Sequence, residues 1–480
     1  MTTRARMSVL AGLAASVAIV GAAGHQRDAS RPPNIVVIFT DDQGYGDLGS
    51  YGHPTIRTPH LDRMAAEGQR WTSFYVADSV CTPSRAGLLT GRLPARIGMA
   101  GDHVTGRRVL FPDSSGGLPQ AEVTIAEMLK ARGYATAAVG KWHLGHLPQH
   151  LPTTQGFDTY FGIPYSNDMD AVGTGPDGQA LDGPARRQRL MDPRIEYWNV
   201  PLMRGGAVVE RPADQTSLTR RYTDEAIGFV RANRDRPFFL YLAHSMPHMP
   251  LFRSEAFADR SPRGLYGDVI EEIDAHTGRL LDTLRELDLA GQTLVVFTSD
   301  NGPWAIFNEQ GGSAGPLRGA KGGTYEGGMR VPGIFWWPGT IAPGVITQMG
   351  ATLDLLPTIA ALTGANAPSD RPLDGHDLSP ILKTGARSPR GEMFYYRGTT
   401  LYAVRVGSFK AHLVTRSEYG GEPPVEHQNW PLYNLDHDPS ERFDIGAQHP
   451  DVLARMRDLV VAHRQALTPA PSMLDARVRP

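Results

Sequence analysis

Four pairs of polar residues in this sequence each follow a run of apolar residues, and together they could do chemistry. The pairs, in chain order, are Asp41 and Asp42, Lys141 and His143, His244 and His248, and Asp300 and Asn301. The preceding runs, among them "NIVVIF" and "TLVVFT", are typical of strands buried on both faces of a parallel sheet. Because ligands bind outside the carboxyl ends of such strands, we expect the four pairs to converge at one edge.

The oxygen-bearing members of these pairs predict a metal site. They are Asp41, Asp42, Asp300 and Asn301. Hard divalent cations such as Ca²⁺ or Mg²⁺ prefer oxygen ligands, and crowded carboxylates repel one another unless a cation lies between them. Taken alone, "TDDQGYG" and "SDNG" are equally compatible with solvated turns at strand ends. Their combination with basic residues in neighbouring loops favours the metal.

Those basic residues predict an oxyanion beside the cation. They are Arg85, Lys141, His143 and Lys321. A cation flanked by such donors suits a tetrahedral oxyanion, either phosphate or sulfate. Lys321 lies in "RGAKGGTYEGG", whose glycines allow close approach of the backbone to a ligand; a flexible loop with a solvated lysine is the alternative. We expect His244 to be a structural histidine.

The only cysteine among the 480 residues, Cys81, opens the stretch "CTPSRAGLLTGR". A single cysteine excludes an intramolecular disulfide. Thr82 and Pro83 are predicted to be the cap and first turn of a helix, which places Cys81 beside a helix N-terminus. A thiol has a lowered pKa there and faces anions, as a nucleophile would; a small buried apolar residue is the alternative.

Helices alternating with buried runs predict an α/β fold with a large, mostly parallel central sheet between helices. The clearest helix start is the capping box of Thr124 and Glu127 on "TIAEMLKARG". Beyond residue 385 the pattern changes to short antiparallel strands followed by a helix, "VLARMRDLVVAHRQAL". Residues 170–215 are rich in Gly, Pro, Asp and Arg and are predicted to form a long surface excursion. The predicted domains are a signal peptide at 1–24, a catalytic domain at 25–385 and a smaller α+β domain at 386–480.

The N-terminus and the composition bear on location and partners. Arg4 and Arg6 precede a run of apolar, small residues, with cleavage expected after Ala23 or Gly24; an uncleaved anchor is the alternative. The single cysteine and the lack of Asn-x-Ser/Thr sites favour a periplasmic or secreted bacterial protein. A net charge of −2 gives no reason to expect nucleic acid, and no other stretch predicts stable membrane insertion.

The sequence closely resembles the formylglycine-dependent sulfatases, and the arylsulfatases in particular. "CTPSR" matches the C-x-P-S-R signature of the family, and "GKWHLG", "GIPYSND", "SMPHMP", "TSDNGP" and "KGGTYEGG" match further blocks in the same order. The resemblance covers residues 32–340, and "PLYNLDHDPSE" extends it into the C-terminal region. It implies an alkaline-phosphatase-like fold and the hydrolysis of sulfate monoesters, either aryl sulfates or sulfated carbohydrates, with release of inorganic sulfate.

The resemblance also implies a cofactor chemistry. Cys81 would be converted to Cα-formylglycine by a formylglycine-generating or other sulfatase-maturing enzyme, with Pro83 and Arg85 completing the recognition sequence. The hydrated aldehyde would provide the hydroxyl that attacks sulfur. The cation would be Ca²⁺, with Mg²⁺ as the alternative, and its ligands would be Asp41, Asp42, Asp300, Asn301 and an oxygen at position 81.

The remaining roles follow from the same resemblance. Arg85 would hold the formylglycine, and Asp300 would accept the proton of the attacking hydroxyl. Lys141 and Ser166 would bind sulfate, and His143 would assist its release. His248 and Lys321 would contact the ester and protonate the leaving oxygen. Two alternatives remain open: a phosphodiester or phosphonate ester hydrolase of the same superfamily, and a non-catalytic oxyanion-binding protein with unmodified Cys81.

Overall fold

The computed structural model describes residues 31–101, 106–172, 183–419 and 422–478, together with Thr2. Apart from Thr2, the predicted signal peptide at 1–24 lies outside the described residues. No helix within the described ranges is long and apolar enough to cross a membrane. Residues Pro32–Pro480 form one unit, within which the predicted domain boundary at 385–386 stays a prediction.

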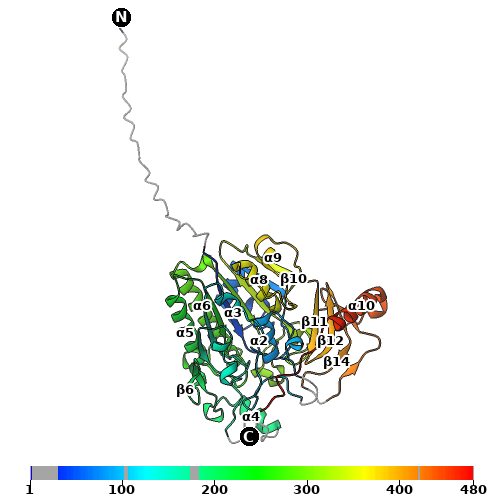
Figure 1. Ribbon diagram of the computed structural model, residues 1–480, viewed down its shortest axis with the longest axis horizontal. Helices are drawn as coiled ribbons and strands as arrows, with labels where there is room; N and C mark the ends of the chain where they lie inside the picture. The colour runs from blue at the N-terminus through cyan, green and yellow to red at the C-terminus, as the bar shows by residue number, and fades with distance from the viewer. Residues whose placement is uncertain (1, 3–30, 102–105, 173–182, 420–421, 479–480) are drawn as a thin grey trace. The chain divides into compact units, whose positions relative to one another are not determined.

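A ten-stranded sheet with the order β10-β2-β9-β8-β1-β7-β3-β4-β5-β6 occupies the centre of this unit (Figure 1). Its strands are β1 Asn34–Thr40, β2 Gln69–Tyr75, β3 Ala135–Gly140, β4 Thr159–Gly162, β5 Leu202–Arg204, β6 Ala207–Glu210, β7 Phe238–Ala243, β8 Thr293–Ser299, β9 Arg330–Trp336 and β10 Gly344–Ala351. The five middle strands from β8 to β4 are mutually parallel, whereas β9 and the β5–β6 edge pair antiparallel. The predicted mostly parallel sheet is therefore confirmed.

Helices cover both faces of the sheet (Figure 1). They are α1 Pro59–Glu67, α2 Cys81–Thr90, α3 Ile125–Lys130, α4 Gly183–Met191, α5 Leu218–Ala232, α6 Leu265–Glu286, α7 Glu326–Met329, α8 Leu355–Thr363, α9 Ser379–Thr384 and α10 Pro450–Ala466. Alternate residues of β1 enter two separate cores. Val36 and Ile38 pack with α1, α5 and α6, whereas Ile35, Val37 and Phe39 pack with α2, α3 and α8. This two-sided burial explains why the strands read as continuous apolar runs.

The C-terminal residues form the expected small antiparallel sheet. Its strands are β11 Glu392–Arg397, β12 Thr400–Val406, β13 Phe409–His412 and β16 Leu432–Asn434, with a separate ribbon of β14 Val414–Thr415 and β15 Val425–Glu426. Helix α10 packs on this sheet, where His463 stacks on Phe394 with ring centroids 3.6 Å apart. Tyr395 and Val404 share one apolar core with α2 and α8, so the small sheet packs firmly against the region that begins at Cys81.

The predicted surface excursion at 170–215 is wrong in part. Its described portion contains α4 and the hairpin β5–β6, which extends the edge of the central sheet next to β4. Residues 173–182 of this stretch lie outside the described residues. The strands are only three and four residues long, so they carry too little alternation to be recognised in the sequence.

Candidate active site

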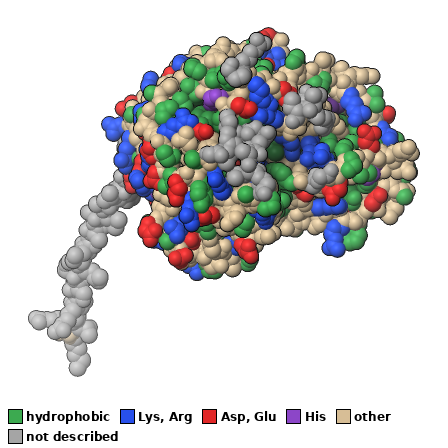
Figure 2. Space-filling view, turned by 90° about the horizontal axis from the view of Figure 1, so that it is seen from below, with side chains coloured by type: hydrophobic (Ala, Val, Ile, Leu, Met, Phe, Trp, Pro, Cys, Tyr) green, Lys and Arg blue, Asp and Glu red, His purple; other side chains and the backbone are tan. Residues whose placement is uncertain are grey.

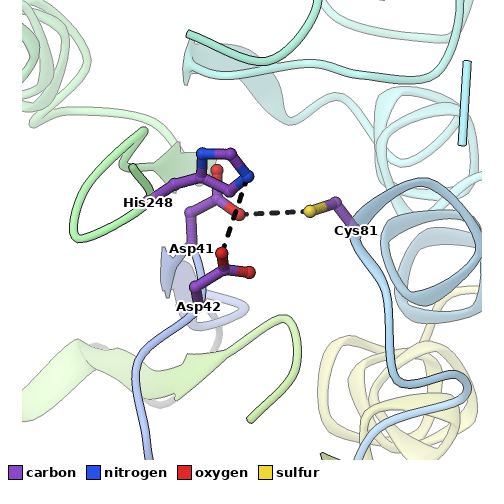
Figure 3. Close-up of side chains that lie close together, drawn as sticks. All are labelled: Asp41, Asp42, Cys81 and His248. Carbon is purple, nitrogen blue, oxygen red and sulfur yellow. Dashed lines mark hydrogen bonds and ion pairs between the residues drawn. The ribbon is translucent and has the colours of Figure 1, made fainter. Parts of the chain in front are cut away.

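The loops after β1, β3, β7 and β8 converge on the start of α2, as the sequence predicts. Asp41 follows β1 directly, and the Cys81 thiol donates to its Oδ1 at 3.3 Å. Figure 3 shows Cys81, Asp41, Asp42 and His248 pointing toward one another from three separate segments. One potential ligand atom from each of these four residues lies within 4.8 Å of the others, and all four are buried. Three parts of the chain thus build one buried centre.

The acidic residues form a compact oxygen cluster. The backbone N–H of Asp42 donates to Asp300 Oδ1 at 3.1 Å, and Asn301 Nδ2 donates to Asp42 Oδ1 at 2.7 Å. Asp42 adopts a left-handed conformation with φ of 63°, which turns the chain back across the end of the sheet. Asn301 Oδ1 is buried and has no hydrogen-bond partner among the described residues. A buried acceptor of this kind beside two carboxylates fits a hard divalent cation.

Electrostatics within the cluster also fit a cation. Burial raises the pKa of Asp42 to about 7 despite Lys321, and the carboxylates of Asp41 and Asp300 add to the rise. Burial and the Asp41 carboxylate likewise raise the pKa of Asp300. Burial acts in the same direction on Asp41, but Lys141, His248 and Arg85 hold its pKa well below the usual range. The protein's own cations therefore compensate the charge of Asp41 but not fully those of Asp42 and Asp300.

Arg85, on helix α2 four residues after Cys81, bonds to the oxygen cluster through Asp300. Its side chain is fully buried, and its Nε and terminal N–H groups donate to Asp300 Oδ2 at 3.0 and 2.7 Å. A further N–H donates to the carbonyl of Lys141 at 2.9 Å. This guanidinium ties α2 to the loops after β3 and β8, which fixes the position of residue 81 against them.

A second group of polar side chains, beginning with Lys141, bonds to Asp41 and to its neighbours. Lys141 Nζ donates to Asp41 Oδ2 at 2.6 Å and to Ser166 Oγ at 3.0 Å. Ser166 lies 3.4 Å from His248 Nε2, and His248 Nε2 lies 3.5 Å from Asp42 Oδ2. The structure thus brings these predicted sulfate-binding residues together.

Asn167 and Trp304 contact His248 in the site, although neither is among the site residues predicted from the sequence. Two acceptors, Asn167 Oδ1 at 3.0 Å and the Met249 carbonyl at 2.5 Å, face His248 Nδ1, so Nδ1 carries the proton and Nε2 faces the centre as an acceptor. Trp304 packs beside the His248 ring at 5.0 Å. Asn167 lies inside the matched block "GIPYSND", and Trp304 directly follows the matched block "TSDNGP". The position of these blocks was the signal that could have identified both residues.

The histidines divide into three environments. His143 Nε2 lies 2.9 Å from the Leu110 carbonyl, which makes Nε2 the protonated nitrogen. Its Nδ1 is buried and has no partner within the described ranges. Burial and Lys141 hold the His143 pKa well below its usual value, and burial lowers that of His248 to about 3. His244 is also buried; neither of its ring nitrogens has a hydrogen-bond partner among the described residues, and its ring faces Tyr222. Its expected structural role stays a prediction.

Lys321 closes the site from the glycine-rich loop before α7. Its Nζ donates to Asp42 Oδ2 at 2.7 Å and lies 4.3 Å from the centre of the Trp304 ring. The solvated-lysine alternative is therefore wrong for this residue, which is only 4% exposed. Lys321, Cys81, His143, Ser166 and His248 all line one cavity of about 690 Å³.

Two expectations about Cys81 need correction. Helix α2 begins at Cys81 rather than Pro83, with Val80 as the N-cap, and the Thr82 hydroxyl bonds to the His143 carbonyl instead of capping the helix. The thiol pKa is raised well above its usual value rather than lowered, first by burial and then by the carboxylates of Asp300 and Asp41. The thiolate that a direct cysteine nucleophile requires is thus disfavoured.

Comparisons with known proteins agree with this geometry. The profile of the Sulfatase family matches residues 33–365, and that of the C-terminal region of aryl-sulfatase matches residues 388–479. Human arylsulfatase A is 43% identical over 97% of this chain and 93% of its own, and the pig N-acetylgalactosamine-6-sulfatase is 40% identical over 93% and 88%. The crystal structure of Ps i-CgsB in complex with a neocarrahexaose superposes with a TM-score of 0.76 at 29% identity, covering 94% of this chain and 95% of that one. This chain belongs to the sulfatase family.

Proposed function

We propose that this protein hydrolyses sulfate monoesters with a formylglycine made from Cys81 and a divalent cation held by the neighbouring oxygen cluster. The observation that carries the proposal is the shared cavity. Cys81 opens into the same space as His143, Ser166, His248 and Lys321, and it lies in contact with Asp41. Family membership supports the reaction class, sulfuric ester hydrolysis.

The residues that would hold the cation are Asp41, Asp42, Asp300 and Asn301, together with an oxygen at position 81. The unpartnered Asn301 Oδ1 and the raised pKa of Asp42 support this assignment. When bound, the cation would polarise a sulfate oxygen as a Lewis acid. Oxygen donors alone suit both Ca²⁺ and Mg²⁺, and we propose Ca²⁺ on the family resemblance.

Cys81 is placed to be a precursor of the nucleophile. The hydrated aldehyde would supply a hydroxyl at the position now held by Sγ, 3.3 Å from the Asp41 carboxylate. Arg85 would keep this residue against the cluster through its two bonds to Asp300. Asp300 would accept the hydroxyl proton, the role that the family resemblance gives it.

Basic and polar side chains would bind the ester. Lys141 and Ser166 form a bonded pair that can turn toward a sulfate oxygen. His143 is fixed by the Leu110 carbonyl with Nδ1 free, so it can take up a proton as sulfate leaves. His248 Nε2 is an acceptor here, so its ring must first gain a proton before it can donate to the leaving oxygen. Lys321 would contact the same ester oxygen.

The substrate and the location are further parts of the proposal. We infer that the natural substrate is a sulfated carbohydrate, since one relative is named for N-acetylgalactosamine 6-sulfate and a structural neighbour holds a neocarrahexaose. The basic, small and apolar residues at the start of the chain support export to the periplasm or medium. A sulfatase-maturing enzyme would be the required protein partner.

Release of inorganic sulfate tests the proposal. The protein, co-expressed with a formylglycine-generating enzyme, is supplied with 4-nitrophenyl sulfate, a set of sulfated monosaccharides and a phosphonate ester. We expect sulfate release from at least one sulfate ester, with a higher kcat/KM than for the phosphonate, and none from the Cys81→Ala control. A preference for the phosphonate, or equal activity of the control, would contradict it.

A further inference from the structure

The cavity above Cys81 carries more positive charge than one sulfate ester requires. Its described lining includes seven Lys or Arg residues but only two acidic ones, Asp168 and Glu418. Figure 2 shows Lys and Arg side chains gathered in several patches on the face seen from below. Such an excess of one sign in a concave site attracts ligands of the opposite sign.

Some of these charges already have a carboxylate partner. Lys321 pairs with Asp42 at 2.7 Å, and Arg107 pairs with a carboxylate of its own loop at 2.5 Å. Arg186 reaches Asp168 at 3.5 Å. By contrast, no carboxylate of the described residues lies within 4.0 Å of a guanidinium nitrogen of Arg187, Arg397 or Arg416. The positive charge that has no carboxylate partner within the described residues is therefore located on Arg187, Arg397 and Arg416.

Arg108, Arg397 and Arg416 form a group on one wall of the cavity. Burial first, and then the charges of Arg108 and Arg416, lower the pKa of Arg397 to about 10. The neighbouring guanidinium charges are the smaller cause of this shift, and the three side chains all line the same cavity. Asp78, which lies 3.3 Å from Arg108, is their one acidic neighbour in the described ion pairs.

This group lies directly beside the reacting centre. Arg108 donates to the carbonyl of Gly322 at 2.9 Å, the residue after Lys321. It also donates to Ser79 Oγ at 3.3 Å, two residues before Cys81. Its Nε is buried and has no hydrogen-bond partner in the part of the chain that the structure describes. A group bound at this wall would thus be adjacent to the ester held at Cys81.

The need to hold the loop around residues 416–418 in place explains only part of the grouping of these three arginines. Arg397 donates to the carbonyls of Ser417 and Glu418 at 2.9 and 3.1 Å, which fixes the loop that carries Arg416. One guanidinium would suffice for that purpose. Three of them in one wall repel one another unless an anion lies between them, and planar guanidinium groups match sulfate and carboxylate oxygens well.

We propose that Arg108, Arg397 and Arg416 form a second anion-binding subsite, which receives another sulfate or a carboxylate of the same saccharide. This inference rests on the proposed function and narrows it: the preferred substrates are polyanionic glycans, with one anionic group beside the sulfate that is cleaved. Arg108 contacts the loops of the active site, so the subsite and the reacting centre bind one continuous ligand.

Three matched disaccharides test the subsite: one with a single sulfate, one with a second sulfate and one with a uronic acid beside the sulfate. The wild-type enzyme should show a kcat/KM for at least one dianionic substrate about ten-fold above that for the monosulfated one, the gain of one charge-assisted contact. Whichever dianionic substrate gains identifies the second anion as sulfate or carboxylate. Arg416→Gln should remove most of the gain and leave the monosulfated rate within about two-fold.

Two further variants locate the effect. Arg231→Gln, on the exposed face of α5, should leave all three rates unchanged. Arg187→Gln changes another unpaired arginine of the same cavity and should reduce the gain less than Arg416→Gln does. Equal rates for all three disaccharides, or equal losses for Arg187→Gln and Arg416→Gln, would overturn the subsite while leaving sulfate hydrolysis intact. An enzyme inactive on every sulfate ester would instead contradict the proposed function.

Discussion

Two buried clusters of charge in this protein differ in how completely they are satisfied. The first is the oxygen cluster of the active site. The second, here called the interface cluster, surrounds Glu326 between the central and C-terminal sheets. There, Glu326 accepts from Tyr395 at 2.8 Å, from Lys410 at 3.0 Å and from Tyr75 at 2.6 Å. Lys410 and the arginines around it hold the Glu326 pKa at about 2 despite burial, whereas Asp42 has a pKa of about 7.

The difference separates a structural cluster from a functional one. In the interface cluster each carboxylate oxygen of Glu326 has donors, and Lys410 also donates to the Thr324 carbonyl, close to Lys321. In the active site Asn301 Oδ1 and His143 Nδ1 have no partner among the described residues. Buried polar groups cost free energy when they are unsatisfied, and in the active site these atoms lie beside the carboxylate cluster and the cavity, where a ligand would satisfy them. The interface cluster holds the Lys321 loop in place for that ligand.

The largest expected effect is on the nucleophile. Cys81→Ser should lower steady turnover by roughly a thousand-fold or more. A serine hydroxyl can attack sulfur but has no second hydroxyl with which to expel sulfate, so the variant should accumulate covalently bound sulfate. Turnover of an aryl sulfate and the intact mass of the protein measure both effects. Steady turnover at the wild-type rate would refute the assignment of the nucleophile.

The next largest effect is on stability, in the interface cluster. Lys410→Met leaves Glu326 and Glu441 buried without their shared cation, since Lys410 lies 3.0 Å from each. Removing one partner of a buried ion pair costs about 3 to 5 kcal/mol of the free energy of unfolding. Urea denaturation measures this loss, with exposed Lys383→Met as the control. A loss under about 1 kcal/mol would show that the cluster is not structural.

The pH dependence of stability should separate the two clusters. The Glu326 pKa falls from 4.5 to about 2 on folding. Its contribution to the free energy of unfolding is therefore complete above pH 4.5 and is lost as the pH falls toward 2. That contribution is about 3 kcal/mol. The Asp42 pKa rises from 3.8 to about 7, so without a cation its contribution falls as the pH rises from about 4 to 7.

Unfolding free energies of wild type, Glu326→Gln and Asp42→Asn, measured in chelator from pH 3 to 7, check this contrast. Glu326→Gln should flatten the acidic side of the profile, and Asp42→Asn should flatten the side near neutral pH. Identical profiles for the two variants would remove the distinction between the clusters.

A cation should stabilise only the active-site cluster. Ca²⁺ at a hundred times its dissociation constant adds about 2.7 kcal/mol to the free energy of unfolding, so the melting temperature should rise. Asn301→Ala removes a neutral ligand and should abolish most of this rise, whereas Lys410→Met should keep it. Melting curves with Ca²⁺, with Mg²⁺ and with a chelator measure the effect. A rise that survives in Asn301→Ala would place the cation elsewhere.

The smallest expected effect concerns His244, which is buried near the site and which we expect to take no part in catalysis. Because no described residue bonds to either ring nitrogen, His244→Leu should change the free energy of unfolding by less than about 1.5 kcal/mol. It should also leave kcat/KM for an aryl sulfate within about two-fold. His248→Ala, in the same loop, should lower kcat/KM much more. Equal losses for the two variants would give His244 an unexpected role.

Much of the active site was predictable because its residues follow recognisable strands. The runs before Asp41 and Asp300 are buried on both faces, so their parallel pairing and their convergence followed from the apolar pattern alone. The predicted helix start was two residues too late. The Thr82 hydroxyl donates to the His143 carbonyl and does not cap the helix, which begins at Cys81. The raised thiol pKa was also missed, because burial among carboxylates appears only in three dimensions.

The group of Arg108, Arg397 and Arg416 could not be predicted from the sequence, for a different reason. Arg108 and Arg397 are 289 positions apart in the chain, and each is ordinary in its own segment. Only the packing of the C-terminal sheet against the loop before α7 brings them to one cavity. Long-range contacts between loops leave no periodic pattern, so no local reading of the chain could have found them.

The identity of residue 81 in the mature protein tests the central claim most directly. Trypsin releases the peptide Trp71–Arg85, "WTSFYVADSVCTPSR", whose mass can be measured after co-expression with a formylglycine-generating enzyme. We predict a peptide that has lost its thiol and gained an aldehyde, which reacts with a hydrazide probe and whose abundance rises in proportion to sulfatase activity. A fully active enzyme whose peptide carries only the unmodified thiol would contradict the account.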